Sequence, residues 1–345
     1  MIKTIPLEDA IGSKLAHDVT EIRPGEFKGP AFRKGHTVCN EDVCHLQRLG
    51  KNHLYLIDLE EDEIHENEAA AIQAKALARD GIIWEDNPKE GKINLYAEKD
   101  GLFVVNTTAL AAFNMIEEVM CATLHTNTLV KKGELVAATR AIPLIMKRAP
   151  IERAAAVARQ NGAVFSVQQL RHAKVGLVIT GNEIYHNLIE DRFAPVLTEK
   201  VNALGSKVCA LKFVPDDAEI INQAISSHLG YGCDLILLTG GMSVDPDDVT
   251  RQGIRKAGAH KLHYGASALP GAMFLVAYLG DVPLLGVPGC GLHHQITVLD
   301  LVLPRILAGE EIGKKELAFL GHGGLCLDCP TCRFPACPFG KTACG

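Results

Sequence analysis

Residues 235–250 read LILLTGGMSVDPDDVT, and this stretch organises the interpretation of the whole chain. Its first four residues are continuously apolar, which is typical of a parallel strand buried on both faces. Gly240 and Gly241 follow at once, and a backbone without side chains lets a ligand approach closely. The polar side chains that come next are Ser243, Asp245, Asp247 and Asp248. The pattern indicates either a ligand site or a strand-to-helix turn with aspartates as helix caps.

The length and composition indicate a globular protein with more than one domain. The chain has 345 residues, and 47% of them are hydrophobic, which is enough for well-packed cores. Its net charge of −6 argues against a general nucleic-acid binder, which would carry a basic excess. There is no apolar run long enough to span a bilayer and no signal-peptide pattern at the start. We therefore expect a cytoplasmic protein with no nucleic-acid and no membrane partner.

Residues 1–150 predict a mixed α+β region whose residues specify no chemistry. Its histidines do not show the spacing of metal ligands. Residues 92–105 alternate in polarity around Lys99-Asp100-Gly101, which predicts a β-hairpin. Residues 151–172 are expected to form a helix and a connector to the rest of the chain.

Residues 173–310 predict an α/β domain with an open, mostly parallel sheet and helices on both faces. Strands are expected at 175–180, 207–214, 234–239, 274–279 and 282–287, and helices at 191–204, 217–229, 247–257 and 292–307. This alternation is typical of right-handed βαβ units. Ligands of such sheets bind beyond the carboxyl ends of the strands.

Glycines or acidic residues follow four of these strands. They are Thr180-Gly181-Asn182-Glu183, Pro215-Asp216-Asp217, Gly240-Gly241-Met242-Ser243 and Pro288-Gly289. Backbone amides at Gly240, Gly241 and Ser243 can hold a phosphate. Carboxylates from Glu183, from Asp216 or Asp217, and from Asp248 can coordinate Mg²⁺ that bridges to the phosphate. Each acid taken alone is equally explained as a helix cap, and the P-loop and dinucleotide motifs are both missing.

At these residues the chain resembles the molybdopterin-binding domain shared by molybdopterin molybdenumtransferases, molybdopterin adenylyltransferases and gephyrin-like proteins. The matching pieces span about residues 174–308 and add Ile189-Glu190-Asp191, Asp248-Val249-Thr250 and Val287 to the motifs above. Residues 10–19 resemble the opening of the molybdenumtransferase branch. The resemblance implies binding of molybdopterin or its adenylate in molybdenum cofactor biosynthesis, and a homodimer. If the chain is catalytic, it implies molybdenum insertion from molybdate with Mg²⁺-assisted cleavage of the adenylate.

The resemblance also implies roles for individual residues. Catalytic roles fall on Asp248, Asp217 and Glu183. Cofactor-binding roles fall on Thr180, Gly181, Asp216, Gly240, Gly241, Ser243, Pro288 and Gly289.

The sequence departs from the family pattern at several positions. The family has a Lys-Pro-Gly-Lys-Pro stretch where residues 262–271 read LHYGASALPG, and it has Asn-Pro where Cys290-Gly291 stand. The Asp-Gly-Tyr-Ala motif of the transferase N-terminal half is not found. Fewer cations neutralise molybdate and phosphate less well. A non-catalytic carrier or sensor of the cofactor is therefore the alternative, and His263, His293 and His294 are weak candidates to compensate.

Residues 320–345 predict a metal-binding tail. Five of the eleven cysteines lie there, and a cytoplasmic chain is not expected to use them as a disulfide framework. The motif ligands would be Cys326, Cys329, Cys332 and Cys337. Their spacing resembles the bacterial ferredoxin motif with one extra residue, so a 4Fe–4S cluster or Zn²⁺ is expected. A flexible tail with free thiols is the alternative, and an iron–sulfur cluster would suit molybdenum or tungsten enzymes as partners.

Overall fold

The computed structural model describes residues 2–23, 25–57, 59–160, 164–242 and 249–341. The chain divides into two compact units. Unit 1 comprises Met1–Tyr96, Thr108–Leu124 and Leu135–Phe165, and unit 2 comprises Ala97–Thr107, His125–Glu134 and Ser166–Gly345.

Unit 1 begins with short elements around a small core. Its elements there are β1 (Ile2–Pro6), η1 (Leu7–Ala10), β2 (Val19–Arg23), β3 (Phe27–Phe32), α1 (Asn40–Arg48) and β4 (His53–Ile57). Strand β1 pairs antiparallel with β4, and β2 pairs antiparallel with β3. Leu7, Val19 and Leu46 are buried in the core that these elements share.

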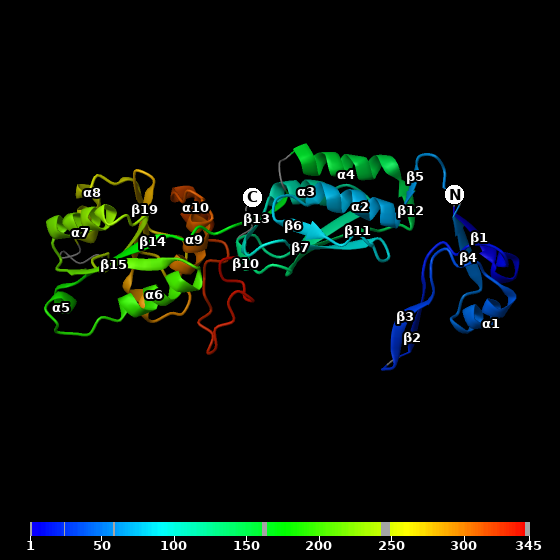
Figure 1. The fold of residues 1–345 in the computed structure, drawn as a ribbon, viewed down its shortest axis with the longest axis horizontal. Helices are drawn as coiled ribbons and strands as arrows, with labels where there is room; N and C mark the ends of the chain where they lie inside the picture. Colours follow the sequence, from blue (N-terminus) through cyan, green and yellow to red (C-terminus); the bar gives the residue numbers. More distant parts are fainter. Residues whose placement is uncertain (1, 24, 58, 161–163, 243–248, 342–345) are drawn as a thin grey trace. The chain divides into compact units, whose positions relative to one another are not determined.

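The remainder of unit 1 is a four-stranded sheet in the order β6-β7-β11-β9, together with helices. The strands are β6 (Ile82–Trp84), β7 (Lys92–Ala97), β9 (Val119–Thr123) and β11 (Leu135–Ala141), and β5 (Glu63–His65) pairs separately with β12 (Ile145–Lys147). The helices are α2 (Glu66–Leu77), α3 (Thr107–Asn114) and α4 (Arg148–Gln160). Helices α2 and α4 pack together, as Figure 1 shows.

The hairpin predicted over residues 92–105 is wrong, although both of its strands exist. Strand β8 (Gly101–Val105) lies between β10 (Thr128–Val130) and β13 (Phe165–Gln168), whereas β7 pairs with β11. The Asp100 carboxylate accepts from the backbone amide of Lys132 and from Nζ of Lys131, both at 2.9 Å. The turn is therefore tied to a distant segment, and a local polarity pattern carries no information about such a partner.

The α/β domain of unit 2 is built on a six-stranded sheet in the order β15-β14-β16-β19-β18-β17 (Figure 1). Its strands are β14 (Lys174–Thr180), β15 (Lys207–Val214), β16 (Leu235–Thr239), β17 (His260–Tyr264), β18 (Leu275–Leu279) and β19 (Val282–Val287). The first four strands of that order are mutually parallel. Strand β18 runs antiparallel to β19, and β17 runs antiparallel to β18. The predicted open, mostly parallel sheet is confirmed.

Helices cover both faces of this sheet. Successive residues of each strand point to opposite sides, so neighbouring residues of one strand contact different helices. Leu177 lies in the same buried cluster as residues of α6 (Phe193–Ala203) and α9 (Val298–Leu307). Val178 lies in the cluster that contains residues of α7 (Ala218–Gly230) and α8 (Thr250–Lys256). Burial on both faces explains why the strands read as continuous apolar runs.

The helix predicted over residues 292–307 begins later than expected. Residues Gly289–Leu292 form a short 3-10 turn, η2, and α9 starts at Val298. The hydroxyl of Thr297 accepts from the amide of Leu299 at 3.3 Å, and the Asp300 carboxylate accepts from the amide of Thr297 at 2.7 Å. This capping box fixes the helix start. Residues 293–297 form a loop that borders three pockets.

The C-terminal tail follows α10 (Lys314–Phe319) and docks on the α/β domain. The amide of Leu269 donates to the carbonyl of Gly324 at 2.7 Å, and the amide of Cys326 donates to the carbonyl of Leu269 at 2.9 Å. Phe339 is 3% exposed and belongs to the cluster beneath α9. The described part of the tail is therefore held by both backbone hydrogen bonds and apolar burial.

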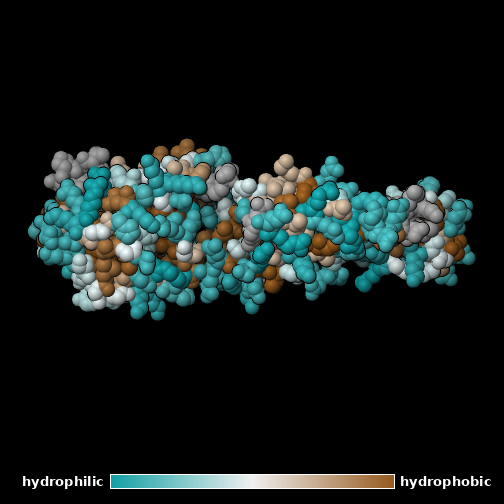
Figure 2. All heavy atoms as spheres, turned by 90° about the horizontal axis from the view of Figure 1, so that it is seen from above, coloured by the Kyte–Doolittle hydropathy of each residue, from teal (hydrophilic) through white to brown (hydrophobic). Residues whose placement is uncertain are grey.

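The surface of the chain is largely polar in the view of Figure 2, where apolar side chains occur in small scattered groups. Within the described ranges, there is no helix with both the length and the apolar character needed to cross a membrane.

Candidate functional site

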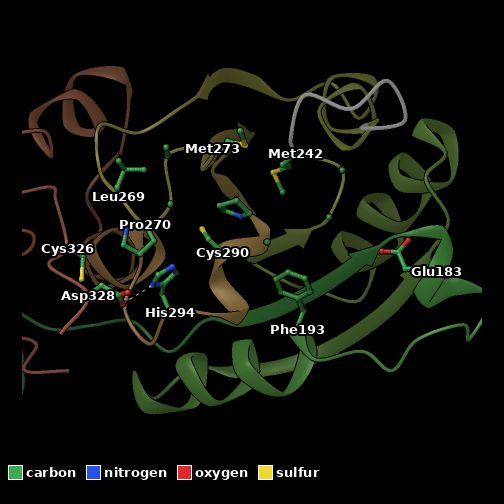
Figure 3. A pocket seen from close by; sticks show the side chains of 16 residues that line it. Glu183, Phe193, Met242, Leu269, Pro270, Met273, Cys290, His294, Cys326 and Asp328 are labelled. Atoms are coloured by element: carbon green, nitrogen blue, oxygen red, sulfur yellow. Dashed lines mark ion pairs between the residues drawn. The ribbon is translucent and has the colours of Figure 1, made fainter. Parts of the chain in front are cut away.

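The strand order creates a topological switch point between β14 and β16. The chain leaves β14 through α6 to reach β15 on one side, and returns through α7 to β16 on the other. Switch points are where open α/β sheets bind ligands. A pocket of about 770 Å³ lies there, and we call it the strand-end pocket. It is lined by Glu183 after β14, residues 240–242 after β16 and residues 288–290 after β19 (Figure 3).

The rest of this pocket comes from residues that are distant in sequence. They are Phe193 of α6, residues 269–273, His294, and Cys326 and Asp328 of the tail. Four sulfur-containing side chains face the pocket, namely Met242, Met273, Cys290 and Cys326. Lysine and arginine are not among the described residues that line it. A bound anion would therefore depend on backbone amides or on a bound cation for neutralisation.

The Gly240-Gly241 turn is shaped by two buried threonines. Both glycines have positive φ, at 78° and 54°. A Cβ at Gly240 would lie 2.4 Å from the carbonyl oxygen of Thr180, and one at Gly241 would lie 2.5 Å from Oγ1 of Thr250. Any side chain would clash with these groups, so the two glycines are required for packing. The same geometry leaves the backbone bare at the rim of the pocket.

Thr180 and Gly181 lie behind the pocket and do not line it. The Thr180 hydroxyl donates to the carbonyl of Thr239 at 2.8 Å and lies 3.2 Å from Oγ1 of Thr250. Gly181 precedes the short helix α5 (Asn182–Tyr185) with φ of 140°. These two residues position the wall of the pocket, and direct contacts from them to a ligand stay a prediction.

The three predicted acids that the structure describes have different surroundings. Glu183 lines the strand-end pocket. Asp217 caps α7, where its Oδ1 accepts from the amides of Glu219 at 2.8 Å and Ile220 at 3.0 Å. Hydrogen bonds from the amides of Ile220 and Glu219 lower the pKa of Asp217. Asp248 and the predicted phosphate ligand Ser243 lie outside the described residues.

Asp216 ties two strand ends together. Its Oδ2 accepts from the amide of Asn182 at 3.0 Å, and its own amide donates to Oδ1 of Asn182 at 3.2 Å. The loop after β15 is thus fastened to the start of α5, which carries Glu183. Asp216 and Asp217 are not lining residues of the strand-end pocket, so the structure gives both of them supporting contacts close to it.

Several residues that line the strand-end pocket were not assigned to the ligand site from the sequence. Phe193 reaches the pocket because the Asp191 carboxylate accepts from its amide at 2.9 Å and starts α6 there. Residues 269–273 include the end of the stretch in which the lysines of the resembled family are missing. Cys290 stands where that family has asparagine. A comparison of motifs marks the last two places as unusual, but it does not reveal that Asp328 shares their pocket.

The four motif cysteines of the tail line a second pocket of about 380 Å³, which we call the tail pocket. Cys326 and Cys337 pack against the core of the α/β domain, and Cys329 and Cys332 are exposed. Throughout the described ranges, there is no group of three His, Cys, Asp or Glu side chains arranged to hold a metal ion. The ligand types suit a metal, but binding would require the thiols to move closer, and a tail metal stays a prediction.

Comparisons with known proteins place the family of the α/β domain. Residues 176–308 match the family model described as "Probable molybdopterin binding domain". Residues 4–58 match a different model, described as "Domain of unknown function (DUF8806)". The opening segment that resembles the molybdenumtransferase branch falls inside the second match.

Curated relatives match only part of this chain. A CinA-like protein of Thermosipho melanesiensis is 34% identical over 80 residues, which are 23% of this chain and 20% of the relative. A molybdopterin molybdenumtransferase of Synechococcus elongatus is 26% identical over 144 residues, which are 39% of this chain and 36% of the relative. The chain spans about a fifth of the length of the first of these relatives and about a third of the second.

Solved structures that match cover about two fifths of the chain. The protein CinA of Thermoplasma acidophilum has a TM-score of 0.36 and 17% identity, covering 39% of this chain and 98% of that one. MoaB of Thermus thermophilus has a TM-score of 0.35 and 20% identity, covering 40% and 98%. The family assignment rests on the match over residues 176–308 and on the motifs at the strand ends. Over those residues, the chain matches the family described as "Probable molybdopterin binding domain".

Proposed function

We propose that the α/β domain binds molybdopterin or its adenylate in the strand-end pocket, as a step in molybdenum cofactor biosynthesis. The observation that carries this proposal is the convergence of three strand ends on one pocket in a domain of this family. Glu183, the Gly240-Gly241 turn and Pro288-Gly289 were expected at the site from sequence, and all of them line this pocket. Its volume of about 770 Å³ falls in the range of small-molecule and cofactor sites.

The two ends of the pocket suit different parts of such a ligand. Exposed backbone at Gly240 and Gly241 suits the phosphate, which amides can hold without a cationic side chain. Thioethers of Met242 and Met273 and the thiol of Cys290 give a polarisable, mostly apolar wall. Sulfur atoms make favourable contacts with flat aromatic rings, so this wall suits the pterin. Ser243 remains the proposed hydroxyl partner of the phosphate.

Mg²⁺ is the proposed counter-ion of the phosphate. In phosphate sites this ion is usually held by one or two carboxylates, with water and phosphate oxygens completing the shell. Glu183 supplies one carboxylate at the pocket, and Asp248 is the proposed second ligand. When bound, the ion would neutralise charge that lysine side chains neutralise in the resembled family. Asp217 acts by holding the start of α7, because its carboxylate already accepts two amide hydrogen bonds.

The proposed transferase reaction is cleavage of the adenylate coupled to molybdenum insertion. A phosphoanhydride P–O bond between the pterin phosphate and AMP breaks, water supplies the new oxygen, and AMP leaves. Adenylyl-molybdopterin, molybdate and Mg²⁺ incubated anaerobically with the protein should release AMP. Asp248→Asn should slow this release at least about tenfold while binding is kept, and Asp245→Asn, three residues earlier in the sequence, is the matched control. Tight binding of the adenylate without AMP release would rule out the enzyme and leave a binding protein.

A non-catalytic carrier or sensor of the cofactor is the second candidate. It is favoured by the lining of the strand-end pocket, where the described residues include Glu183 and Asp328 but neither lysine nor arginine. A carrier needs affinity for the ligand and does not need to stabilise the charge that develops when the adenylate is cleaved. It predicts saturable molybdopterin binding that neither molybdate nor Mg²⁺ converts into turnover.

We also propose that the tail binds an iron–sulfur cluster or Zn²⁺ through Cys326, Cys329, Cys332 and Cys337. The shared tail pocket supports it, because all four thiols border one cavity. Anaerobic purification followed by metal analysis tests it: about one zinc or four irons per chain is expected, and neither metal would remove the proposal. A homodimer, and molybdenum or tungsten enzymes as partners, remain proposals from resemblance.

A further inference from the structure

The tail reaches the strand-end pocket through a short extended segment. Residues 325–328 run beside residue 269, with Leu269 and Leu325 forming a parallel bridge. Leu325 and Leu327 are 65% and 68% exposed, so these two side chains face outward. Cys326 lies between them, is half-buried and lines the pocket. Asp328 also lines the pocket, with a backbone φ of 50° and a side chain that is 87% exposed.

The tail contributes to one particular end of the pocket. Figure 3 shows Glu183 at one end, and Cys326, Asp328 and His294 together at the other. Nδ1 of His294 lies 3.8 Å from Oδ1 of Asp328, which connects the loop before α9 to the tail. The His294 side chain is 35% exposed and that of Asp328 is 87% exposed, so the pair contributes little to stability. The position of this pair is what matters, because a ligand that fills the pocket would contact both side chains.

His294, Cys326 and Asp328 line the tail pocket as well as the strand-end pocket. Cys329 and Cys332 line only the tail pocket. The segment 326–328 is thus a partition between the two cavities. Cys326 is the first cysteine of the proposed metal motif and also a lining residue of the ligand site, whereas Cys329 belongs to the motif alone.

We propose that the cysteine-rich tail is a wall of the ligand site, and that Cys326 and Asp328 contact the ring end of a bound molybdopterin. The inference rests on the proposed function of the strand-end pocket. The phosphate lies toward Glu183 and the glycine turn, so the pterin ring extends toward the tail. The Asp328 carboxylate accepts hydrogen bonds from ring N–H groups, which neutral ring donors make readily to a charged acceptor. The sulfur of Cys326 lies against the ring.

This role can be separated from a metal role, because Cys326 and Cys329 are three residues apart in one motif. A purely metal-binding tail treats the two cysteines alike. A wall of the ligand site requires Cys326 and not Cys329. The variants Cys326→Ala and Cys329→Ala of the full-length chain therefore form a matched pair, read out by anaerobic titration with molybdopterin.

Cys326→Ala is expected to weaken molybdopterin binding about fivefold to tenfold, and Cys329→Ala to leave it within about twofold of the unaltered protein. Asp328→Ala is expected to weaken binding to a similar extent as Cys326→Ala. Asp281→Ala is its control, since Asp281 is an exposed turn residue between β18 and β19. Equal effects of the two cysteine variants, or no effect of either, would overturn the proposal that the tail forms a wall of the ligand site.

A second measurement uses the unaltered chain and so does not depend on whether a variant folds. Metal-free protein is treated with iodoacetamide, with and without saturating molybdopterin, and the alkylation rate of each cysteine is followed by mass spectrometry. Ligand should slow alkylation at Cys326 at least about fivefold and leave Cys329 unchanged. Equal rates at Cys326 with and without bound ligand would overturn the inference alone. Failure of the unaltered protein to bind molybdopterin would overturn the proposed function and this inference together.

Discussion

The side-chain hydroxyl of Thr250 donates a 3.0 Å hydrogen bond to the backbone carbonyl of Gly240. The bond joins the first residue of α8 to the first residue after β16, and so fastens the two ends of the loop between them. Oγ1 of Thr250 also lies 3.2 Å from Oγ1 of Thr180. The hydroxyls of Thr180 and Thr250 together link the end of β14, the end of β16 and the start of α8.

Thr250→Val tests this fastening with almost no change in side-chain volume. The Gly240 carbonyl loses its hydroxyl donor, which costs about 1–3 kcal/mol in the free energy of unfolding. Loosening of the glycine turn should also weaken molybdopterin binding several-fold. Urea unfolding and ligand titration measure the two effects. Thr198→Val on α6 is the control, and the same loss in both variants would contradict the assigned role.

Gly241→Ala separates the effect of a clash from that of backbone strain. Gly241 and Gly280 have similar φ values of 54° and 59°, so alanine strains both backbones by about 1 kcal/mol. A Cβ at Gly241 would lie 2.5 Å from Oγ1 of Thr250, whereas nothing lies within 4 Å of one at Gly280. We expect Gly241→Ala to lower the urea midpoint at least twice as much as Gly280→Ala. Equal shifts would show that the close approach carries no cost.

His228 should make the α/β domain less stable in mild acid. The side chain is 2% exposed, its Nε2 lies 2.9 Å from the carbonyl oxygen of Leu177, and its buried Nδ1 has no partner among the described residues. Burial lowers the pKa of His228 below the ordinary 6.5, against a smaller opposing effect of the Leu177 carbonyl. The unfolded chain therefore takes up a proton before the folded one does. Stability is complete above about pH 6.5 and falls as the pH drops below it.

The variant His228→Gln isolates this contribution, because glutamine can still donate to the Leu177 carbonyl. One group can add a slope of at most about 1.4 kcal/mol per pH unit. Urea unfolding of both proteins across mildly acidic pH should show a steeper loss for the unaltered chain. Parallel curves would mean that other groups set the acid sensitivity.

Cys209 and Cys233 should join on oxidation. Their sulfur atoms lie 2.9 Å apart, closer than an ordinary non-bonded contact between sulfurs. Burial raises the pKa of Cys233 to about 12, so the exposed Cys209 supplies the attacking thiolate. Diamide would take up the two hydrogens as the S–S bond forms, closing a loop of 24 residues and stabilising the fold by about 3 kcal/mol. Mass spectrometry should show loss of two hydrogens and no free thiol at either site, and separate alkylation of both after diamide would contradict this.

The sheet was predictable from the sequence because most of its strands have a recognisable local pattern. Residues of β14 and β16 are buried on both faces and read as continuous apolar runs ended by glycine. Strand β17 was missed, since His260–Tyr264 is an edge strand with partly exposed polar residues and no such run. The partner of β7 was also missed, because pairing between distant segments leaves no local signal.

The site was predictable only in part, for a related reason. The carboxyl ends of parallel strands lie at the same edge of a sheet, so Glu183, Gly240 and Gly289 could be placed together from the sequence. Whether an acid at such an end caps a helix or faces a ligand depends on side-chain direction, and Asp217 proved to be a cap. The contribution of Asp328 depends on where the tail docks, about 60 residues after Leu269, which the tail contacts. The roles of Asp248 and Ser243, the tail metal and the cytoplasmic location stay predictions.

Titration of the protein with molybdopterin under anaerobic conditions tests the central claim most directly. Ala272 is an exposed lining residue, so Ala272→Trp should fill the strand-end pocket without disturbing the core. Ala111→Trp, at an exposed position of α3, is the control. We predict saturable binding, roughly micromolar or tighter, by the unaltered chain and by Ala111→Trp, and its loss in Ala272→Trp. No saturable binding by the unaltered chain, or undiminished binding by Ala272→Trp, would contradict the claim that this pocket is the molybdopterin site.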